Sequence, residues 1–176
     1  HPDYLEKFQL NTGGNPYYLI ECIREVKRSN LDISVSPGQV ECPIPTILKT
    51  MVLDKMKLLS PNELKVLSAA AILGNAFSPQ KLELMVVDKS EEFLEAVEAL
   101  HTTGFLLVDS KIHPGGGYRF AHDVEREVIL REMDPARKRQ YHLKAARVLV
   151  REREKRTELA AEIALHFEAA GESEKA

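Results

Sequence analysis

GFLLVDSKIHPGGGYRFAHDVEREV, residues 104–128, is the most informative stretch of this sequence. Its apolar run at residues 105–108 predicts a short strand, and the glycine-rich segment at 114–117 predicts a turn. Residues 118–120 then predict a second strand that pairs back on the first. His122 stands where this second strand ends and a new helix is expected to begin. The stretch therefore predicts a β-hairpin followed by a helix.

Several short helices are expected before the hairpin. The sequence Ser60-Pro61-Asn62-Glu63 combines an N-cap serine, a proline at the first helical position and the glutamate of a capping box. Thr46 is expected to cap the preceding helix. Helices followed by strand, turn, strand and helix are the order of a winged-helix domain. The predicted helices cover residues 47–59, 61–73, 79–87, 90–103 and 123–133, with Ile47, Leu48, Met51, Val52 and Lys55 facing inward in the first, Phe93, Val97 and Leu100 in the fourth, and Val124, Val128 and Ile129 in the last.

Further helices are predicted on both sides of this domain. Asn15 and Pro16 suit the N-cap and first position of a helix over residues 16–28. Asp134 and Pro135 repeat that signal before a long helix that ends near residue 154. Its predicted inward residues are Tyr141, Ala145, Val148 and Leu149, and Thr157 is expected to cap a last helix over 158–170 that contains the small residues Ala160, Ala161, Ala164 and Ala169.

The fold class expected from these patterns is mainly α, with a small β-hairpin wing. Residues 29–45 are rich in Ser, Pro and Gly and predict a linker, with weak strand-like alternation at 31–35. The predicted division is a helical segment at 1–30, a linker at 31–45, a winged-helix domain at 46–134 and a helical tail at 135–176.

The composition is that of an ordinary globular protein. The 176 residues carry a net charge of -3, so no overall charge favours nucleic acid or an acidic membrane surface. Cys22 and Cys42 are the only cysteines, which predicts neither a disulfide framework nor a cysteine-based zinc site and fits a cytoplasmic protein. The sequence shows no signal peptide and no apolar run long enough to span a bilayer. Its beginning at His1 suggests an internal piece of a longer protein.

Five segments, in order, resemble one protein family. They are LNTGGNPYYLIECIREV, PIPTILKTMVLDKMKLLSPNELKVLSAAAILGNAFS, YRFAHDVEREVI, ARKRQYHLKAARVL and ELAAEIALHFEAAG. They are similar to the large signalling ATPases of the STAND class, related to the AAA+ superfamily, which occur in bacteria beside cyclase, kinase and LuxR-type domains. The resemblance implies the end of a helical lid, a winged helix and the first tetratricopeptide-like repeat, following a P-loop domain.

The resemblance also implies that another domain of the protein binds the nucleotide. No G-x-x-x-x-G-K-[ST] motif occurs in the 176 residues, so ATP or ADP with Mg²⁺ would be held mainly by the P-loop domain. This segment alone is therefore not expected to be an enzyme. The repeats would bind a protein or peptide partner. The expected role is to couple the nucleotide state of the ATPase to partner sensing in signal transduction.

Nucleotide-contacting residues can be carried over from the family at two places. Gly14, Asn15 and Pro16 match the G-x-P step of the lid, where Pro16 would rest against adenine. His122 matches the histidine of the family's M-H-D motif, which reaches the β-phosphate of ADP and holds the inactive state, although Phe120 and Ala121 here precede it in place of methionine.

Each of these two places also has a simpler interpretation. Gly14, Asn15 and Pro16 are the residue types of a plain capping turn. His122 can be a strand-end residue with a local hydrogen bond, beside Asp123 as the N-cap of the next helix. The sequence leaves both interpretations open.

A DNA-binding regulator with a helical dimerisation tail is the alternative function. The helix predicted at residues 90–103 would be its reading helix, but its charges are Glu91, Glu92, Glu95 and Glu98 with no Lys or Arg. Such a helix would repel DNA phosphates, so DNA binding is disfavoured. A scaffold that no longer contacts nucleotide is a third alternative.

The remaining charged and polar residues predict no catalytic or metal site. Basic residues between 137 and 156 can form either a patch for an acidic partner or a solvated helix face. His101, His142 and His166 are scattered and show no metal-ligand spacing. No Ser-His-Asp or Cys-His arrangement is apparent.

Overall fold

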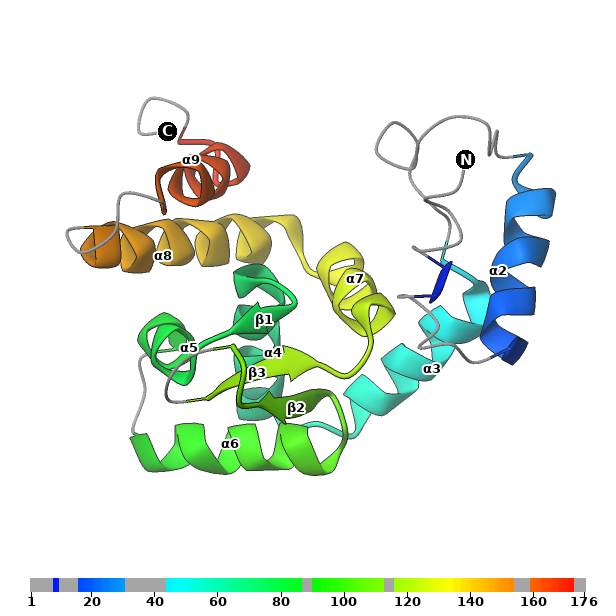
Figure 1. Ribbon diagram of the computed structural model, residues 1–176, viewed down its shortest axis with the longest axis horizontal. Helices are drawn as coiled ribbons and strands as arrows, with labels where there is room; N and C mark the ends of the chain where they lie inside the picture. The colour runs from blue at the N-terminus through cyan, green and yellow to red at the C-terminus, as the bar shows by residue number, and fades with distance from the viewer. Residues whose placement is uncertain are drawn as a thin grey trace.

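The computed structural model describes residues 8–9, 16–30, 44–86, 90–112, 116–153 and 159–172. It is mainly helical with a small antiparallel sheet, as the sequence predicts (Figure 1). None of the described helices combines the length and hydropathy needed to cross a membrane. The elements are α2 (Pro16–Arg28), α3 (Thr46–Lys57), α4 (Pro61–Leu73), β1 (Ala76–Phe77), α5 (Pro79–Val86), α6 (Ser90–Thr102), β2 (Leu106–Asp109), β3 (Gly117–Phe120), α7 (Asp123–Glu132), α8 (Pro135–Arg153) and α9 (Ala160–Ala169).

Helix α4 lies at the centre of the molecule. Its start is the predicted capping box, since the Ser60 hydroxyl accepts from the Glu63 amide and the Glu63 carboxylate accepts from the Ser60 amide. All residues from Val66 to Leu73 are buried, because α4 packs against α5, α6, α7 and α8. Small side chains at residues 69–71 let these neighbours approach closely. Arg126 of α7 adds a hydrogen bond to the Ala71 carbonyl, 2.8 Å away.

The sheet contains the predicted hairpin and one strand that the sequence did not predict. Strands β2 and β3 are antiparallel neighbours, and β1 pairs with the other side of β3, giving the order β1-β3-β2. Strand β1 contains only Ala76 and Phe77, which is too short for a recognisable alternation. Phe77 is buried, and its ring lies edge-on to Phe120 with centroids 6.4 Å apart.

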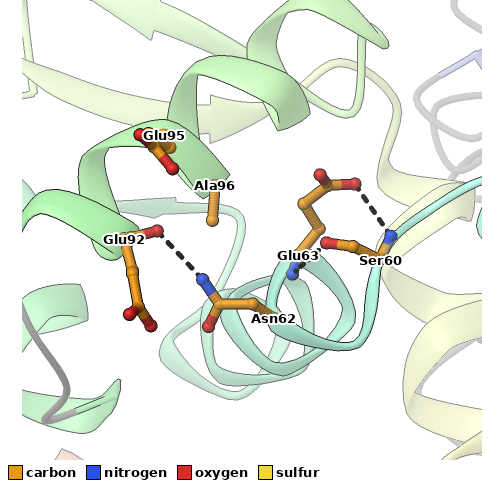
Figure 2. Close-up of a pocket in the computed structure, with 6 residues that line it drawn as sticks. All are labelled: Ser60, Asn62, Glu63, Glu92, Glu95 and Ala96. Atoms are coloured by element: carbon orange, nitrogen blue, oxygen red, sulfur yellow. Dashed lines mark hydrogen bonds between the residues drawn. The ribbon is translucent and has the colours of Figure 1, made fainter.

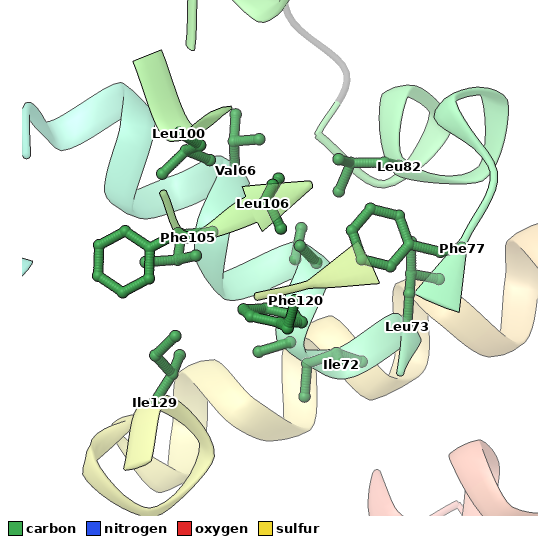
Figure 3. Close-up of a cluster of buried hydrophobic side chains, with 14 of the residues drawn as sticks. Val66, Ile72, Leu73, Phe77, Leu82, Leu100, Phe105, Leu106, Phe120 and Ile129 are labelled. Carbon is green, nitrogen blue, oxygen red and sulfur yellow. The ribbon is translucent and has the colours of Figure 1, made fainter. Parts of the chain in front are cut away.

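The hydrophobic core lies between the sheet and the surrounding helices. Figure 3 shows side chains of α4 and α5 meeting those of α6, α7 and the strands. The predicted inward residues Phe93, Val97 and Leu100 of α6 are buried, as are Val124, Val128 and Ile129 of α7. These periodicity-based predictions are confirmed because each helix has one well-defined neighbour side.

Helix α8 joins the same core. Asp134 caps it through the Arg137 amide, as predicted, and its residues Tyr141, Ala145 and Val148 are buried with those of α4 and α5. A second, small cluster joins α8 to α9 through Ala146, Leu149, Ile163 and Phe167. His142, early in α8, contacts His166, late in α9, so the chain reverses direction between the two helices.

Several local predictions are wrong or lie outside the described residues. Thr46 is the first residue of α3 and not its cap, because Pro45 occupies the N-cap position without a side-chain hydrogen bond. Leu48 and Val52 are buried, but Ile47 and Met51 on the same helix are exposed, since α7 covers only one side of α3. In α9, for which no inward side was predicted, Ala160, Ala161 and Ala169 are exposed, while Ile163 and Phe167 face α8. The Asn15 cap, the strand at 31–35 and the Thr157 cap fall outside the described ranges.

Candidate functional site

His122 occupies the corner between β3 and α7. Its backbone is extended, with φ -138° and ψ 135°, and it is the N-cap residue of α7, although its side chain makes no capping hydrogen bond. The alternative in which Asp123 is the N-cap is therefore wrong, because Asp123 is already helical. The His122 carbonyl accepts from the Glu125 amide at 3.1 Å, while the residue as a whole is exposed. The imidazole is thus accessible to a ligand.

The charges next to His122 are mainly acidic. Asp123 and Glu125 both lie in the first turn of α7, where carboxylates interact favourably with the helix dipole. They occupy the end of the helix that would otherwise attract a phosphate. Glu125 is paired with Lys55 and the charge of Asp123 interacts with the Arg126 guanidinium, so Asp123 is the carboxylate nearest to His122 in sequence that a bound anion would meet.

The Lys55–Glu125 pair lies beneath this corner. The Lys55 ammonium donates to Glu125 Oε1 at 2.7 Å and to the Gly104 carbonyl at 2.9 Å. It also stands 3.9 Å from the centre of the Phe105 ring, within range of a cation–π interaction. One lysine of α3 thus contacts α7 and the segment that leads into β2. This cluster, Lys55, Gly104, Phe105 and Glu125, is called the Lys55 cluster below.

Glu125 is unusual for a charged residue because it is buried. Its side chain is only 7% exposed, and Oε2 has no hydrogen-bond partner among the described residues. Burial raises the pKa of the Glu125 carboxyl, while the hydrogen bond and charge of Lys55 and the charge of His122 act in the opposite direction. The carboxylate is therefore held at an energetic cost that Lys55 offsets only in part.

A second ion pair ties the same two helices together. Lys49 Nζ lies 2.7 Å from Glu132 Oε1, near the other end of the α3–α7 contact. Leu48 and Val52 of the same helix are buried. Helix α3 is therefore attached to the rest of the molecule mainly by a narrow contact with α7. These contacts can link the position of α3 to that of α7, and they do not form an arrangement typical of a catalytic site.

The other predicted nucleotide-contacting residues are not part of this site. Gly14 and Asn15 lie outside the described residues, and Pro16 is the exposed first residue of α2. Figure 1 shows α2 at one end of the molecule, farther out than α7. Within the described ranges, no hydrogen bond joins Pro16 to His122, so their joint role in binding a nucleotide stays a prediction.

A shallow pocket of about 290 Å³ lies elsewhere, between the start of α4 and α6. Figure 2 shows that its lining is acidic, with Glu63 in the capping box and the Asn62 amide donating to the Glu92 carbonyl at 2.9 Å. The lining offers no histidine, cysteine or lysine for acid–base or nucleophilic chemistry; it consists of Ser60, Asn62, Glu63, Glu92, Glu95 and Ala96. The pocket therefore suits a positively charged group and repels a phosphate.

The sequence did not predict that two of its histidines lie in contact. The Nδ1 atoms of His142 and His166 are 2.9 Å apart across the α8–α9 contact, although the residues looked scattered in the sequence. Burial lowers the pKa of His142 to about 4, helped by the charges of His166, Lys138 and Arg126. Burial also lowers the pKa of His166. Both rings are thus neutral at pH 7, and one Nδ1–H can donate to the other ring.

The described residues contain no group of three or more His, Cys, Asp or Glu side chains that could hold a metal ion. Cys22 is a buried thiol of α2, and Cys42 lies outside the described ranges. No family model, curated protein or solved structure matches the chain.

Proposed function

We propose that this chain is a regulatory segment of a STAND-type signalling ATPase. In this role it couples the ADP or ATP state of a P-loop domain elsewhere in the protein to partner sensing. The order helix, strand, helix, helix, strand, strand from α4 to β3 supports a winged-helix interpretation. The packing of α8 against α9 supports a repeat-like helical tail.

The observation that carries the proposal is the position of His122 beside the Lys55 cluster. His122 is an exposed hydrogen-bonding group at the point where β3, α7 and, through Lys55, α3 come together. A ligand that binds His122 in only one arrangement of α3 and α7 would stabilise that arrangement. Such a shift cannot exceed the difference in the ligand's affinity for the two states.

In the proposed closed state, the His122 imidazole donates a hydrogen bond to the β-phosphate of ADP. Pro16 rests against the adenine as part of the nucleotide-contacting step Gly14-Asn15-Pro16, and the P-loop domain binds the remaining phosphate and Mg²⁺. A protonated imidazole binds phosphate more strongly than a neutral one. Because Asp123 opposes the phosphate, the P-loop domain must supply most of the affinity.

The exposed face of α6 argues against the DNA-binding alternative. Glu91, Glu95 and Glu98 are all exposed, and α6 contains no Lys or Arg. A recognition helix must approach phosphates and usually carries arginine, asparagine or glutamine toward the bases. A winged helix that acts as a protein hinge agrees better with these charges.

The test is nucleotide binding to a longer protein that includes the P-loop domain, compared with its His122→Ala variant. The substitution is expected to weaken ADP binding roughly tenfold, and ATP binding less, because one charge-assisted hydrogen bond is lost. His101→Ala is the matched control, since His101 is an exposed histidine on α6. Equal ADP affinity in the wild-type and His122→Ala proteins would refute the switch role of His122.

A further inference from the structure

Two exposed helix faces of opposite charge lie on different sides of the molecule. Figure 1 shows α6 along the lower edge and α8 across the upper part, with α4, α5 and the sheet between them. The outer face of α6 presents Glu91, Glu95 and Glu98, which we call the acidic face. The outer face of α8 presents Arg137, Lys144 and Arg147, which we call the basic face. Although the net charge of the chain is small, acidic side chains are gathered on α6 and basic side chains on α8.

Within the part of the chain that the structure describes, no ion pair neutralises the charged side chains of either face. Among the described residues, Glu91, Glu95 and Glu98 form no ion pair with a lysine or arginine, and α6 has no basic residue other than His101. Arg137, Lys144 and Arg147 likewise form no ion pair with a described carboxylate. Helix α8 contains no acidic residue before Glu152. Each face is thus available to an external partner of opposite charge.

Each charged face also exposes one large aliphatic side chain. Leu94 is 63% exposed on the acidic face, and Val150 is 43% exposed on the basic face. Both side chains are partly exposed to solvent, Leu94 more than Val150. An apolar contact surrounded by charged residues is the usual arrangement of a protein–protein interface. This feature favours a protein partner over a nucleic acid, which has no aliphatic surface to offer at its phosphates.

The spacing of the charges fits one face against the other. Glu98 follows Glu95 by one helical turn, and Arg147 follows Lys144 by the same interval. Two helices that lie side by side can therefore place both pairs opposite each other. The pocket beside Glu92 and Glu95 adds a recess with an acidic lining, in which an arginine side chain can be held by carboxylates on more than one side.

We propose that the basic face of α8 docks on the acidic face of α6 in a second copy of this chain. The two surfaces differ, so the contact is heterologous and each pair of copies keeps one free face of each charge. Such a contact continues into a ring or a filament instead of stopping at a dimer. The proposal is independent of nucleotide binding, since neither face includes His122 or Pro16.

The test is sedimentation velocity of the chain over a concentration series. Association is expected in about 30 mM NaCl and should weaken roughly tenfold or more in about 500 mM NaCl, because exposed charges are screened over a shorter distance. Glu95→Lys and Arg147→Glu should each abolish association, because each places like charges across the contact. Asp54→Lys is the matched control, since it makes the same charge change on exposed α3. This control should associate like the wild type.

Mixing the two variants gives the decisive result. In an equimolar mixture, the lysine introduced by Glu95→Lys in one copy can face the glutamate introduced by Arg147→Glu in the other. The unchanged faces of the two variants can also pair. Association should therefore return, although neither variant associates alone.

Three outcomes would overturn the proposal. The first is a wild-type chain that stays monomeric at low salt, and the second is a mixture of the two variants that stays monomeric. The third is binding of duplex DNA that is lost in Arg147→Glu, without self-association of the wild type. That result would assign the basic face to nucleic acid.

Discussion

Glu125 should make the stability of the protein depend on pH. Its carboxyl has a pKa raised above the ordinary 4.5 by burial, so the folded state binds its proton more tightly than the unfolded state does. The resulting stabilisation is complete below about pH 4.5 and is lost as the pH rises through the folded pKa. The hydrogen bond and the charge of Lys55 oppose this rise of the Glu125 pKa.

Glu125→Gln should therefore gain stability relative to the wild type as the pH rises. We expect the difference in unfolding free energy to move by about 1 kcal/mol toward the variant for each unit by which burial has raised the pKa. Urea unfolding of both proteins at a series of pH values between about 4 and 8 measures this change. Glu132→Gln removes the more exposed carboxylate of the same helix contact and serves as the control. A difference that stays constant with pH would contradict the prediction.

Gly117 is required where the second strand of the hairpin begins. A Cβ at this position would lie 2.8 Å from side-chain atoms of Ile112 and 2.9 Å from the Phe77 carbonyl. Gly117→Ala should destabilise the protein by about 2 kcal/mol, because the Phe77 carbonyl belongs to β1 and cannot move freely. Thermal unfolding measures the loss.

Two further variants separate the causes at Gly117. Adding Ile112→Ala to Gly117→Ala should recover only part of the stability, since it removes Cγ2 but leaves the close contacts with Cβ of residue 112 and with the Phe77 carbonyl. Gly116→Ala should cost about 1 kcal/mol, because φ is +81° there but no atom lies within 4 Å of the added Cβ. A Gly117→Ala protein as stable as the wild type would show that β1 yields to the added methyl group.

Single-residue roles were predictable only where they depend on neighbours in the sequence. The capping box at Ser60 was correct because all of its partners lie within one helical turn. The role of Lys55 was not predictable, since its partner Glu125 is 70 positions away. The buried position of Glu125 depends on how α3 lies over α7, and no local pattern encodes that packing.

The contact between α8 and α9 should be sensitive to acid. His142 has a pKa of about 4 against the ordinary 6.5, so its neutral form stabilises the folded state. That stabilisation is fully present above pH 6.5 and is lost as the pH falls toward 4. The surrounding charges strengthen the effect, since Lys138, Arg126 and Lys81 outnumber Glu162 around the two rings.

His142→Gln should reduce this acid sensitivity. The wild type is expected to lose about 2 kcal/mol more than the variant between about pH 7 and pH 4.5. Hydrogen exchange of α9 amides at the two pH values measures the opening of the contact directly. His101→Gln, on the exposed side of α6, should behave like the wild type. Equal acid sensitivity of the His142→Gln protein and the wild type would contradict the prediction.

The helices themselves were predicted better than the elements that pack or pair with each other. The starts of α4 and α8 carry strong capping signals, and both were placed correctly. Strand β1 was missed because two residues show no periodicity and are recognisable only through pairing with β3. On α9, helix α8 contacts the large residues Ile163 and Phe167, which no pattern in the sequence had singled out.

The described molecule should unfold as one unit, despite the boundary predicted between residues 134 and 135. Tyr141 of α8 is buried in the main core, and its hydroxyl donates to the Lys65 carbonyl of α4 at 3.2 Å. Tyr141→Ala should therefore cost about 3 kcal/mol and lower the single unfolding transition as a whole. Circular dichroism during urea unfolding measures both properties.

Two control variants show how much of the stability lost in Tyr141→Ala comes from the hydroxyl and how much from the buried ring. Tyr141→Phe keeps the ring and should cost only about 1 kcal/mol, the value of one hydrogen bond. Val150→Ala changes a half-exposed residue on the same helix and should have little effect. Two separate transitions in the Tyr141→Ala protein would show instead that the helical tail is an independent unit.

The arrangement of the whole chain was predictable in outline only. The mainly helical class and the hairpin followed from periodicity and turn residues. The attachment of α8 to α4 and α5 did not follow, because a buried helix face identifies a hydrophobic side but not the element that covers it. The separation of acidic and basic faces likewise became visible only when α6 and α8 had positions in space.

The enclosure of α4 has a consequence for the kinetics of the native state. Its residues from Val66 to Leu73 are buried on every side by other elements, so no local fluctuation can expose their amides while those elements stay in place. Their exchange with deuterium should require unfolding of the entire protein, whereas amides of α2 and α9 should exchange through smaller openings. The slowest-exchanging amides of α4 would therefore report global unfolding under fully native conditions.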